Sequence, residues 1–180
     1  MMELPIQLDS KAQLSEHFTL GEFTISKNHP EVYNIPTHEA IANLKRLCGW
    51  LEVLRKRYNE RYVLDQTTPG PSRSASPLGS SKNSGGEMPI VINSGYRSPQ
   101  LNRKVGGVGT SNHLTGCAVD IRVAGKEQLL RYATILLDYA DETHLDFDEL
   151  LLEKGQHGKI WLHFAVRPDQ NRRKIDFLVV

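Results

Sequence analysis

The stretch at residues 110–123, TSNHLTGCAVDIRV, constrains the fold more than any other part of the chain. It places a histidine and a glycine directly before a run in which apolar residues alternate with others. Successive side chains of a strand point to opposite faces of a sheet, so Val119 and Ile121 share one face and Asp120 lies on the other. The pattern predicts a strand with one buried face and an aspartate on the opposite face.

A glycine stands between the histidine and this strand. Glycine adopts backbone conformations that other residues avoid, so a turn at Gly116 would let His113 fold back over the face of Asp120. The run IWLHFAV at 160–166 has the same alternation, and pairing it beside the first strand would bring His163 to that face. Two imidazoles and a carboxylate can bind zinc and leave a fourth position open for water. Taken alone, the residues also fit a turn with a structural histidine.

The remaining periodicities predict an α+β fold, because helices and strands do not alternate regularly. Apolar residues at steps of three and four predict helices, and short β-branched or apolar runs predict strands. We expect helices at 36–58 and 126–140 with a short one at 20–23, and strands at 89–92, 147–153, 159–166 and 174–180. Residues 93–95 are expected to form the turn that follows the first strand.

With 180 residues, the chain has the size of one domain, and we expect a single domain at 1–180. Residues 67–87 are nearly all Pro, Gly, Ser and Thr with a few charges. Such a composition buries too little apolar surface to offset its ordering entropy. We expect a flexible surface insertion there, either a lid over a site or a plain disordered loop.

Charge and cysteine content exclude several classes of protein. A formal net charge of +1 gives no electrostatic reason for nucleic acid or an anionic membrane as a partner. No stretch approaches the roughly 20 apolar residues of a membrane span. Cys48 and Cys117 are too few for a disulfide framework and form no C-x-x-C pair. The N-terminus lacks the basic and apolar regions of a signal peptide, which predicts synthesis in the cytoplasm.

The motif at 111–120 resembles a known family. Ser111, His113, Gly116, Ala118 and Asp120 match the pattern S-x-H-x-x-G-x-A-x-D of the zinc D-Ala-D-Ala metallopeptidases. These include D-Ala-D-Ala carboxypeptidases and dipeptidases and the peptidase domains of phage endolysins. SGYRSPQLN upstream and WLHFAV downstream resemble the other two blocks of the family, in the same order. The first part of the chain resembles the small branch found in phages and prophages.

The resemblance implies a Hedgehog/DD-peptidase-like fold, with a small, mostly antiparallel sheet and helices packed on one side. It also implies one zinc ion held by His113, Asp120 and His163. Arg97 would bind a substrate carboxylate or carbonyl, for which its fork of donors is suited; the alternative is a surface salt bridge. Ser111 would bind near the substrate, or serve only to cap its loop.

The general base departs from the best-known pattern of the family. Many members carry Glu-x-x-His, but Ile160 occupies the glutamate position three residues before His163. The reaction still needs a group that takes a proton from the attacking water and returns it to the leaving amine. We expect Glu153 to be this group, because it ends the strand that leads into the ligand strand. Asp148 and Glu149 are the competitors.

These residues predict a zinc peptidase that hydrolyses an amide bond in the stem peptide of bacterial peptidoglycan. It would act as a D-Ala-D-Ala carboxypeptidase or as an endolysin-type endopeptidase, and the sequence leaves the bond open. We expect a monomer that reaches the wall through a phage holin or another non-classical route. The alternatives are a non-catalytic module that binds a cell-wall peptide or protein on the same fold, and a metal-free structural protein of a phage particle.

Overall fold

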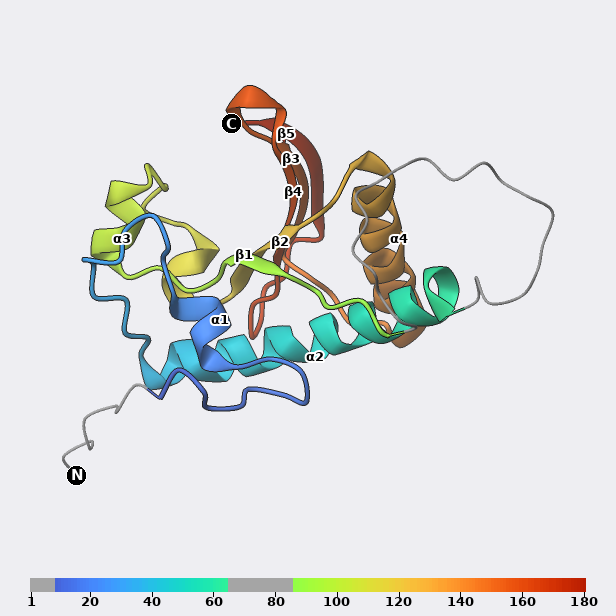
Figure 1. Ribbon diagram of the computed structural model, residues 1–180, viewed down its shortest axis with the longest axis horizontal. Coiled ribbons are helices and arrows are strands. Elements are labelled where there is room, and N and C mark those ends of the chain that lie inside the picture. Colours follow the sequence, from blue (N-terminus) through green and yellow to red (C-terminus); the bar gives the residue numbers. More distant parts are fainter. Residues whose placement is uncertain (1–8, 65–85) are drawn as a thin grey trace.

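The computed structural model describes residues 9–64 and 86–180 (Figure 1). The predicted insertion at 67–87 lies outside these residues except for its last two positions. Its role as a lid or a loop therefore stays a prediction.

A five-stranded sheet forms the centre of the fold, with strand order β1-β2-β4-β3-β5. The pairs β1/β2, β2/β4 and β3/β4 are antiparallel, and only β3/β5 is parallel. The predicted α+β class with a mostly antiparallel sheet is confirmed. The strands are β1 (Ile92–Ser94), β2 (Ala118–Arg122), β3 (Glu149–Lys154), β4 (Ile160–Ala165) and β5 (Lys174–Val179).

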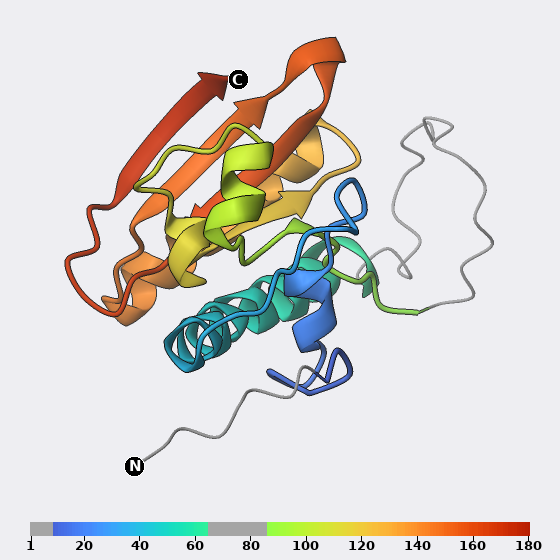
Figure 2. The same ribbon diagram turned by 90° about the vertical axis from the view of Figure 1, so that its left-hand side faces the viewer.

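Two long helices cover one face of the sheet, and the shorter elements lie around its other side. Figure 2 shows α3 in front of the sheet and α4 behind it. The expected packing of helices on one side holds for the long helices α2 and α4, whereas α3, which the periodicity did not predict, lies on the opposite side. The helices are α1 (Leu20–Thr24), α2 (His38–Tyr62), α3 (Pro99–Lys104) and α4 (Lys126–Thr143), with 3-10 turns η2 (Asn112–Thr115) and η3 (Gln156–Gly158).

The helix α2 begins where its cap predicts and runs four residues beyond the predicted end. The Thr37 side chain accepts a hydrogen bond from the Ala40 amide at 3.1 Å, which satisfies one of the free N–H groups of the first turn. Leu44, Leu47 and Leu51 recur on one face and are fully buried. This apolar face, rather than helix propensity alone, fixes α2 against the sheet.

The first strand differs from its predicted position. The sequence predicted a strand at 89–92 and a turn at 93–95, but β1 comprises Ile92–Ser94. Ser94 is paired with Asp120, and the Val91 carbonyl accepts a hydrogen bond from the Arg122 amide at 2.9 Å. Pairing with β2 therefore keeps the chain extended through residues that favour turns in isolation.

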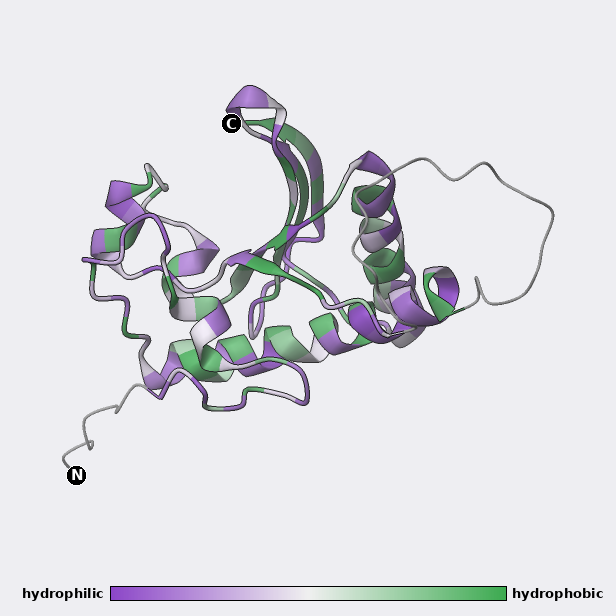
Figure 3. Cartoon of the chain, viewed as in Figure 1, coloured by the Kyte–Doolittle hydropathy of each residue, from purple (hydrophilic) through white to green (hydrophobic). Residues whose placement is uncertain are grey.

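The core lies between the sheet and its two long helices, where apolar segments of both layers face each other (Figure 3). Val119, Ile121, Leu162 and Phe164 of β2 and β4 have no exposed surface. Because side chains alternate, the residues between them point to the face away from α2 and α4. No helix in the described part of the chain is long and apolar enough to cross a membrane.

Candidate metal centre

Asp120 and His163 lie directly opposite each other on the paired strands β2 and β4. The Nδ1 atom of His163 is 2.9 Å from Oδ1 of Asp120, and both side chains are largely buried. Because the back of both strands is packed into the core, their backbones hold the two groups rigidly. The predicted pairing of these two strands is confirmed.

His113 reaches the same point from the turn before β2. Gly116 ends η2 with φ of 72°, in the left-handed region that favours glycine. The Nδ1–H group of His113 donates to the Gly95 carbonyl at 2.6 Å. The other ring nitrogen, Nε2, therefore carries the lone pair that can bind a metal. This Nε2 atom is 3.3 Å from Oδ1 of Asp120. The glycine turn therefore folds the imidazole back over the strand, as the sequence predicted.

The three groups could hold a metal ion. One ligand atom from each of His113, Asp120 and His163 lies within 4.8 Å of the others, and all three residues are buried. Tetrahedral zinc with bonds of about 2.0–2.1 Å holds its ligand atoms about 3.3 Å apart. The distances of 3.3 and 2.9 Å from Oδ1 to the two imidazole nitrogens come close to this spacing. The donor set and its dimensions thus fit a zinc ion.

The ionisation of the three residues is strongly coupled. Burial opposes the charge on Asp120, but His113 and His163 outweigh it and hold the pKa of this carboxyl far below its usual range. Burial also lowers the pKa of His113. For His163, burial is outweighed by the carboxylates of Asp120 and Glu149, which raise its pKa to about 9. A metal ion would have to displace a proton from this site.

Arg97 lies at the centre of the site, bound to the predicted metal ligand Asp120. Its Nη2 donates to Oδ2 of Asp120 at 2.6 Å, and its Nε donates to the Ser94 hydroxyl at 2.9 Å. Arg97 thereby binds Oδ2 of Asp120, whereas Oδ1 faces the two imidazoles. Its Nη1 makes no hydrogen bond to the described residues, so a donor remains for a substrate.

Ser111 caps the turn that carries His113. Its hydroxyl accepts a hydrogen bond from the His113 amide at 3.3 Å, at the N-terminus of η2. This geometry corresponds to the capping role that the sequence left open, and the contact with a substrate stays a prediction.

Glu153 lies on β3, on the same face of the sheet as the metal centre. Its register partner on β4 is Trp161, two residues before His163. Diagonal neighbours on paired strands are about 7–8 Å apart at Cα, so Glu153 can reach a water molecule held near His163. Burial raises the pKa of Glu153 above its usual value.

A network of polar groups that the sequence did not predict lies beside the histidines. Asp148 is fully buried and accepts hydrogen bonds from Arg172 at 2.8 and 2.7 Å and from Asn112 at 2.7 Å. Asn112 also donates to Glu149 Oε2 at 2.9 Å. That oxygen is 3.5 Å from Nε2 of His163, which has no hydrogen-bond partner among the described residues. The sequence had indicated Asp148 and Glu149 only as competing bases, and Asn112 stood out only by its position beside His113.

Comparison of the sequence with known proteins finds a match to a family model. Residues 69–138 match the family model Peptidase M15. The matched segment contains Arg97, His113 and Asp120 and ends before β3 and β4, so the geometry of Glu153 and His163 comes from the structure alone. The curated proteins give no match.

The structure is an α+β domain with a buried group of two histidines and an aspartate that could hold a metal ion. This family match supports the predicted relationship to the zinc D-Ala-D-Ala metallopeptidases of the M15 family and supports a peptidase.

Proposed function

We propose that this protein is a zinc-dependent peptidase that hydrolyses an amide bond in peptidoglycan stem peptides. The observation that carries the proposal is the convergence of His113, Asp120 and His163 on one buried point. Zinc bound there would lower the pKa of an attacking water molecule and polarise the carbonyl of the scissile bond. The side chains around it supply the remaining steps.

Glu153 is the general base in this proposal. It would accept a proton from the attacking water and return it to the leaving amine, a function worth typically 10²–10⁴-fold in rate. Its raised pKa favours this exchange, because a base works best when its pKa lies nearer the working pH. Glu153 forms no ion pair with the described residues that would hold its charge in place.

The two competing carboxylates are engaged elsewhere. Asp148 is fully buried and is bound by Arg172 and Asn112. The pKa of Glu149 is held at about 2 by His163, Asn112 and Arg172, so this carboxylate is a poor proton acceptor. These contacts support Glu153 as the base.

Glu149 takes a positioning role in the proposal. A histidine that ligates a metal through one nitrogen usually donates its other N–H to a carboxylate or carbonyl. Nδ1 of His163 faces Asp120, and Nε2 faces Glu149. Glu149 would therefore orient the imidazole, while Arg97 would direct a substrate oxygen through its free Nη1.

The test is a digest of defined muropeptides by the zinc-loaded protein, with and without a chelator, read by mass spectrometry. We expect cleavage that the chelator abolishes, and the masses of the fragments identify a carboxypeptidase or an endopeptidase. Glu153→Gln should retain zinc and lower kcat by about 10²–10⁴-fold. Glu127→Gln, on the exposed face of α4, is the matched control and should behave as wild type.

The test also distinguishes two alternatives, the first of which is motivated by Ile160 in place of the glutamate of Glu-x-x-His. A non-catalytic module would bind zinc and stem peptide without releasing a fragment, and its affinity for peptide would survive Glu153→Gln. A metal-free structural protein would contain no stoichiometric metal by elemental analysis. Either result would overturn the proposed peptidase.

A further inference from the structure

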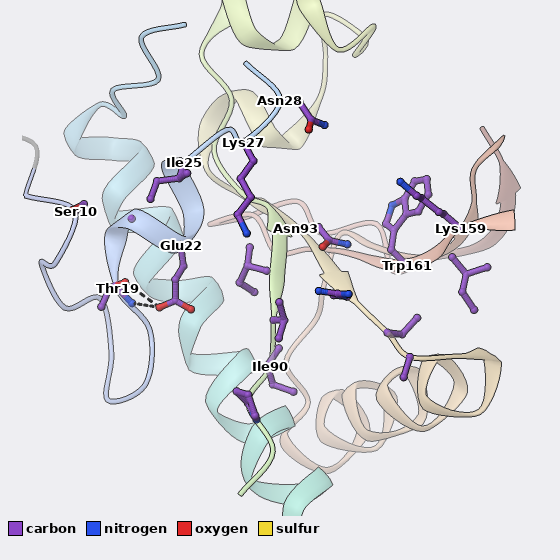
Figure 4. A pocket seen from close by; sticks show the side chains of 18 of the residues that line it. Ser10, Thr19, Glu22, Ile25, Lys27, Asn28, Ile90, Asn93, Lys159 and Trp161 are labelled. Carbon is purple, nitrogen blue, oxygen red and sulfur yellow. Dashed lines mark hydrogen bonds between the residues drawn. The ribbon is translucent and has the colours of Figure 1, made fainter. Parts of the chain in front are cut away.

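A groove with a volume of about 980 Å³ opens at the β1 side of the sheet (Figure 4). Residues 89–93, including part of the edge strand β1, line it. Figure 4 shows Glu22 and Lys27 on one side of this strand and Lys159 and Trp161 on the other. The groove is large enough for several residues of a peptide.

The groove adjoins the proposed catalytic site along strands β2 and β4. Arg122 lines it and follows Asp120 by two residues on the same face of β2. Trp161 lines it too and precedes His163 by two residues on β4. Arg122 and Trp161 are register partners, as are Asp120 and His163. Along the two strands, the pair Asp120 and His163 of the metal centre is thus followed by the pair Arg122 and Trp161, which lines the groove.

The charges that line the groove are unbalanced. Lys27, Arg122 and Lys159 are exposed, and none forms an ion pair within the described parts of the chain. Glu22 is the only carboxylate among the lining residues, and its Oε1 already accepts hydrogen bonds from Thr19. By contrast, Arg97 at the metal centre is neutralised by Asp120. The groove is therefore suited to an anionic ligand.

We propose that this groove binds an acidic, extended segment of the substrate peptide that runs away from the scissile bond. Arg122 and Lys159 recognise its carboxylate, and Trp161 offers an apolar surface beside them. The inference rests on the proposed function, because the groove becomes a substrate subsite only if the metal centre cleaves the peptide. Stem peptides meet this requirement where the α-carboxylate of their glutamate is free.

The edge strand that lines the groove also suits an extended peptide. Among the described strands, β1 ends the sheet and pairs only with β2. A peptide can add to such an edge through its main chain, while its side chains are read by the walls. The main chain would then set the register, and the cations would select acidic residues.

The experiment compares two stem peptides that differ only in whether the glutamate α-carboxylate is free or amidated. We expect wild type to have a lower KM for the free acid. The double variant Arg122→Gln, Lys159→Gln should lose this preference by raising the KM for the free acid, with each lost contact contributing up to about fivefold. Its kcat on both peptides and its KM for the amidated peptide should stay unchanged.

Lys56→Gln, on the exposed side of α2, is the matched control for a lost surface cation and should keep the preference. An unchanged preference in the double variant would overturn the proposal, as would an equal fall in kcat for both peptides. Circular dichroism verifies that the variants are folded.

Binding measurements separate this proposal from the proposed function. If wild type cleaves neither peptide, the peptidase fails, but calorimetry with zinc-loaded protein still tests the groove. Tighter binding of the free acid, lost in the double variant, supports an acidic-peptide groove without catalysis. Equal binding of both peptides overturns the groove as well.

Discussion

At the scale of single residues, Asp120 organises the site by using its two oxygens differently. Oδ2 is bound by Arg97, and Oδ1 lies between the imidazoles of His113 and His163. A buried carboxylate needs such partners, because burial without them is costly. The same arrangement leaves one oxygen and two imidazole nitrogens directed at a common point.

The first prediction concerns Glu149, which is 3.5 Å from the free nitrogen of His163. Glu149→Ala removes the carboxylate that we propose orients this imidazole, and we expect a 10–100-fold loss of zinc affinity. Titration of the apoprotein with zinc against a competing chelator measures it, and the visible spectrum of the cobalt form reports the ligand geometry. Glu149→Gln keeps a hydrogen-bond acceptor and should recover part of the affinity. Wild-type affinity in Glu149→Ala would contradict this role.

The second prediction concerns the acid stability of the network around Asp148. Burial opposes ionisation of this carboxyl, but Arg172 and Asn112 outweigh it and lower its pKa in the folded state. A lowered folded pKa adds stability that is present above the unfolded value of about 3.9 and is lost as pH falls through the folded pKa.

Asp148→Asn should therefore lower the free energy of unfolding at neutral pH by about 1–3 kcal/mol, and this loss should shrink below about pH 4. Urea unfolding at several pH values measures it. The control is Asp138→Asn at the half-exposed pair with Arg61, which should change stability little. A loss that stays constant with pH would show that the charge of Asp148 is not the cause.

At the scale of elements, the turn between η2 and β2 decides where His113 points. Gly116 combines a φ of 72° with a close approach to α2, because an added Cβ would lie 2.5 Å from the Ala40 carbonyl oxygen. The turn is also tied to the preceding block, since the Arg97 amide donates to the His113 carbonyl at 3.0 Å. The glycine thus sets both the backbone turn and the packing on α2.

The third prediction tests this turn by comparing two glycines. Gly116→Ala should destabilise the fold by about 1–3 kcal/mol and weaken zinc binding. Gly49→Ala, in the middle of α2 with no atom within 4 Å of the added Cβ, should stabilise it by up to about 1 kcal/mol. Thermal unfolding of both variants measures the contrast. Equal effects would mean that the turn tolerates a side chain.

At the scale of the whole molecule, the metal centre joins segments that are distant in the sequence. His113 comes from a turn, Asp120 from β2 and His163 from β4. A ligand that binds only the folded state stabilises it in proportion to the logarithm of its concentration over Kd. Zinc should therefore strengthen the central part of the sheet.

The fourth prediction is that zinc at a thousandfold excess over Kd stabilises the fold by about 4 kcal/mol, which raises Tm by roughly 10 °C. Removal of zinc with a chelator should reverse the shift in thermal unfolding. The control is His163→Ala, which loses a ligand and should show no shift. A shift of equal size in this variant would place the zinc elsewhere.

The sequence by itself determined the class of fold, the long helices and the three proposed ligands. The helices follow from apolar residues at helical spacing, and the ligands follow from strand alternation together with the family motif. The helical and strand patterns are local, whereas the place of His163 beside Asp120 rested on an expected strand pairing, which the structure confirms. The glycine turn before Asp120 could likewise be predicted from adjacent residues of the sequence.

Only the tertiary structure decided what depends on contacts between distant segments. Pairing with β2 moved β1 from 89–92 to Ile92–Ser94. Packing brought Asn112, Asp148 and Glu149 together behind His163, although Asp148 lies 36 positions from Asn112. These contacts also support Glu153 as the base over Asp148 and Glu149. The ion pairs and hydrogen bonds that engage Asp148 and Glu149 exist only in the folded chain.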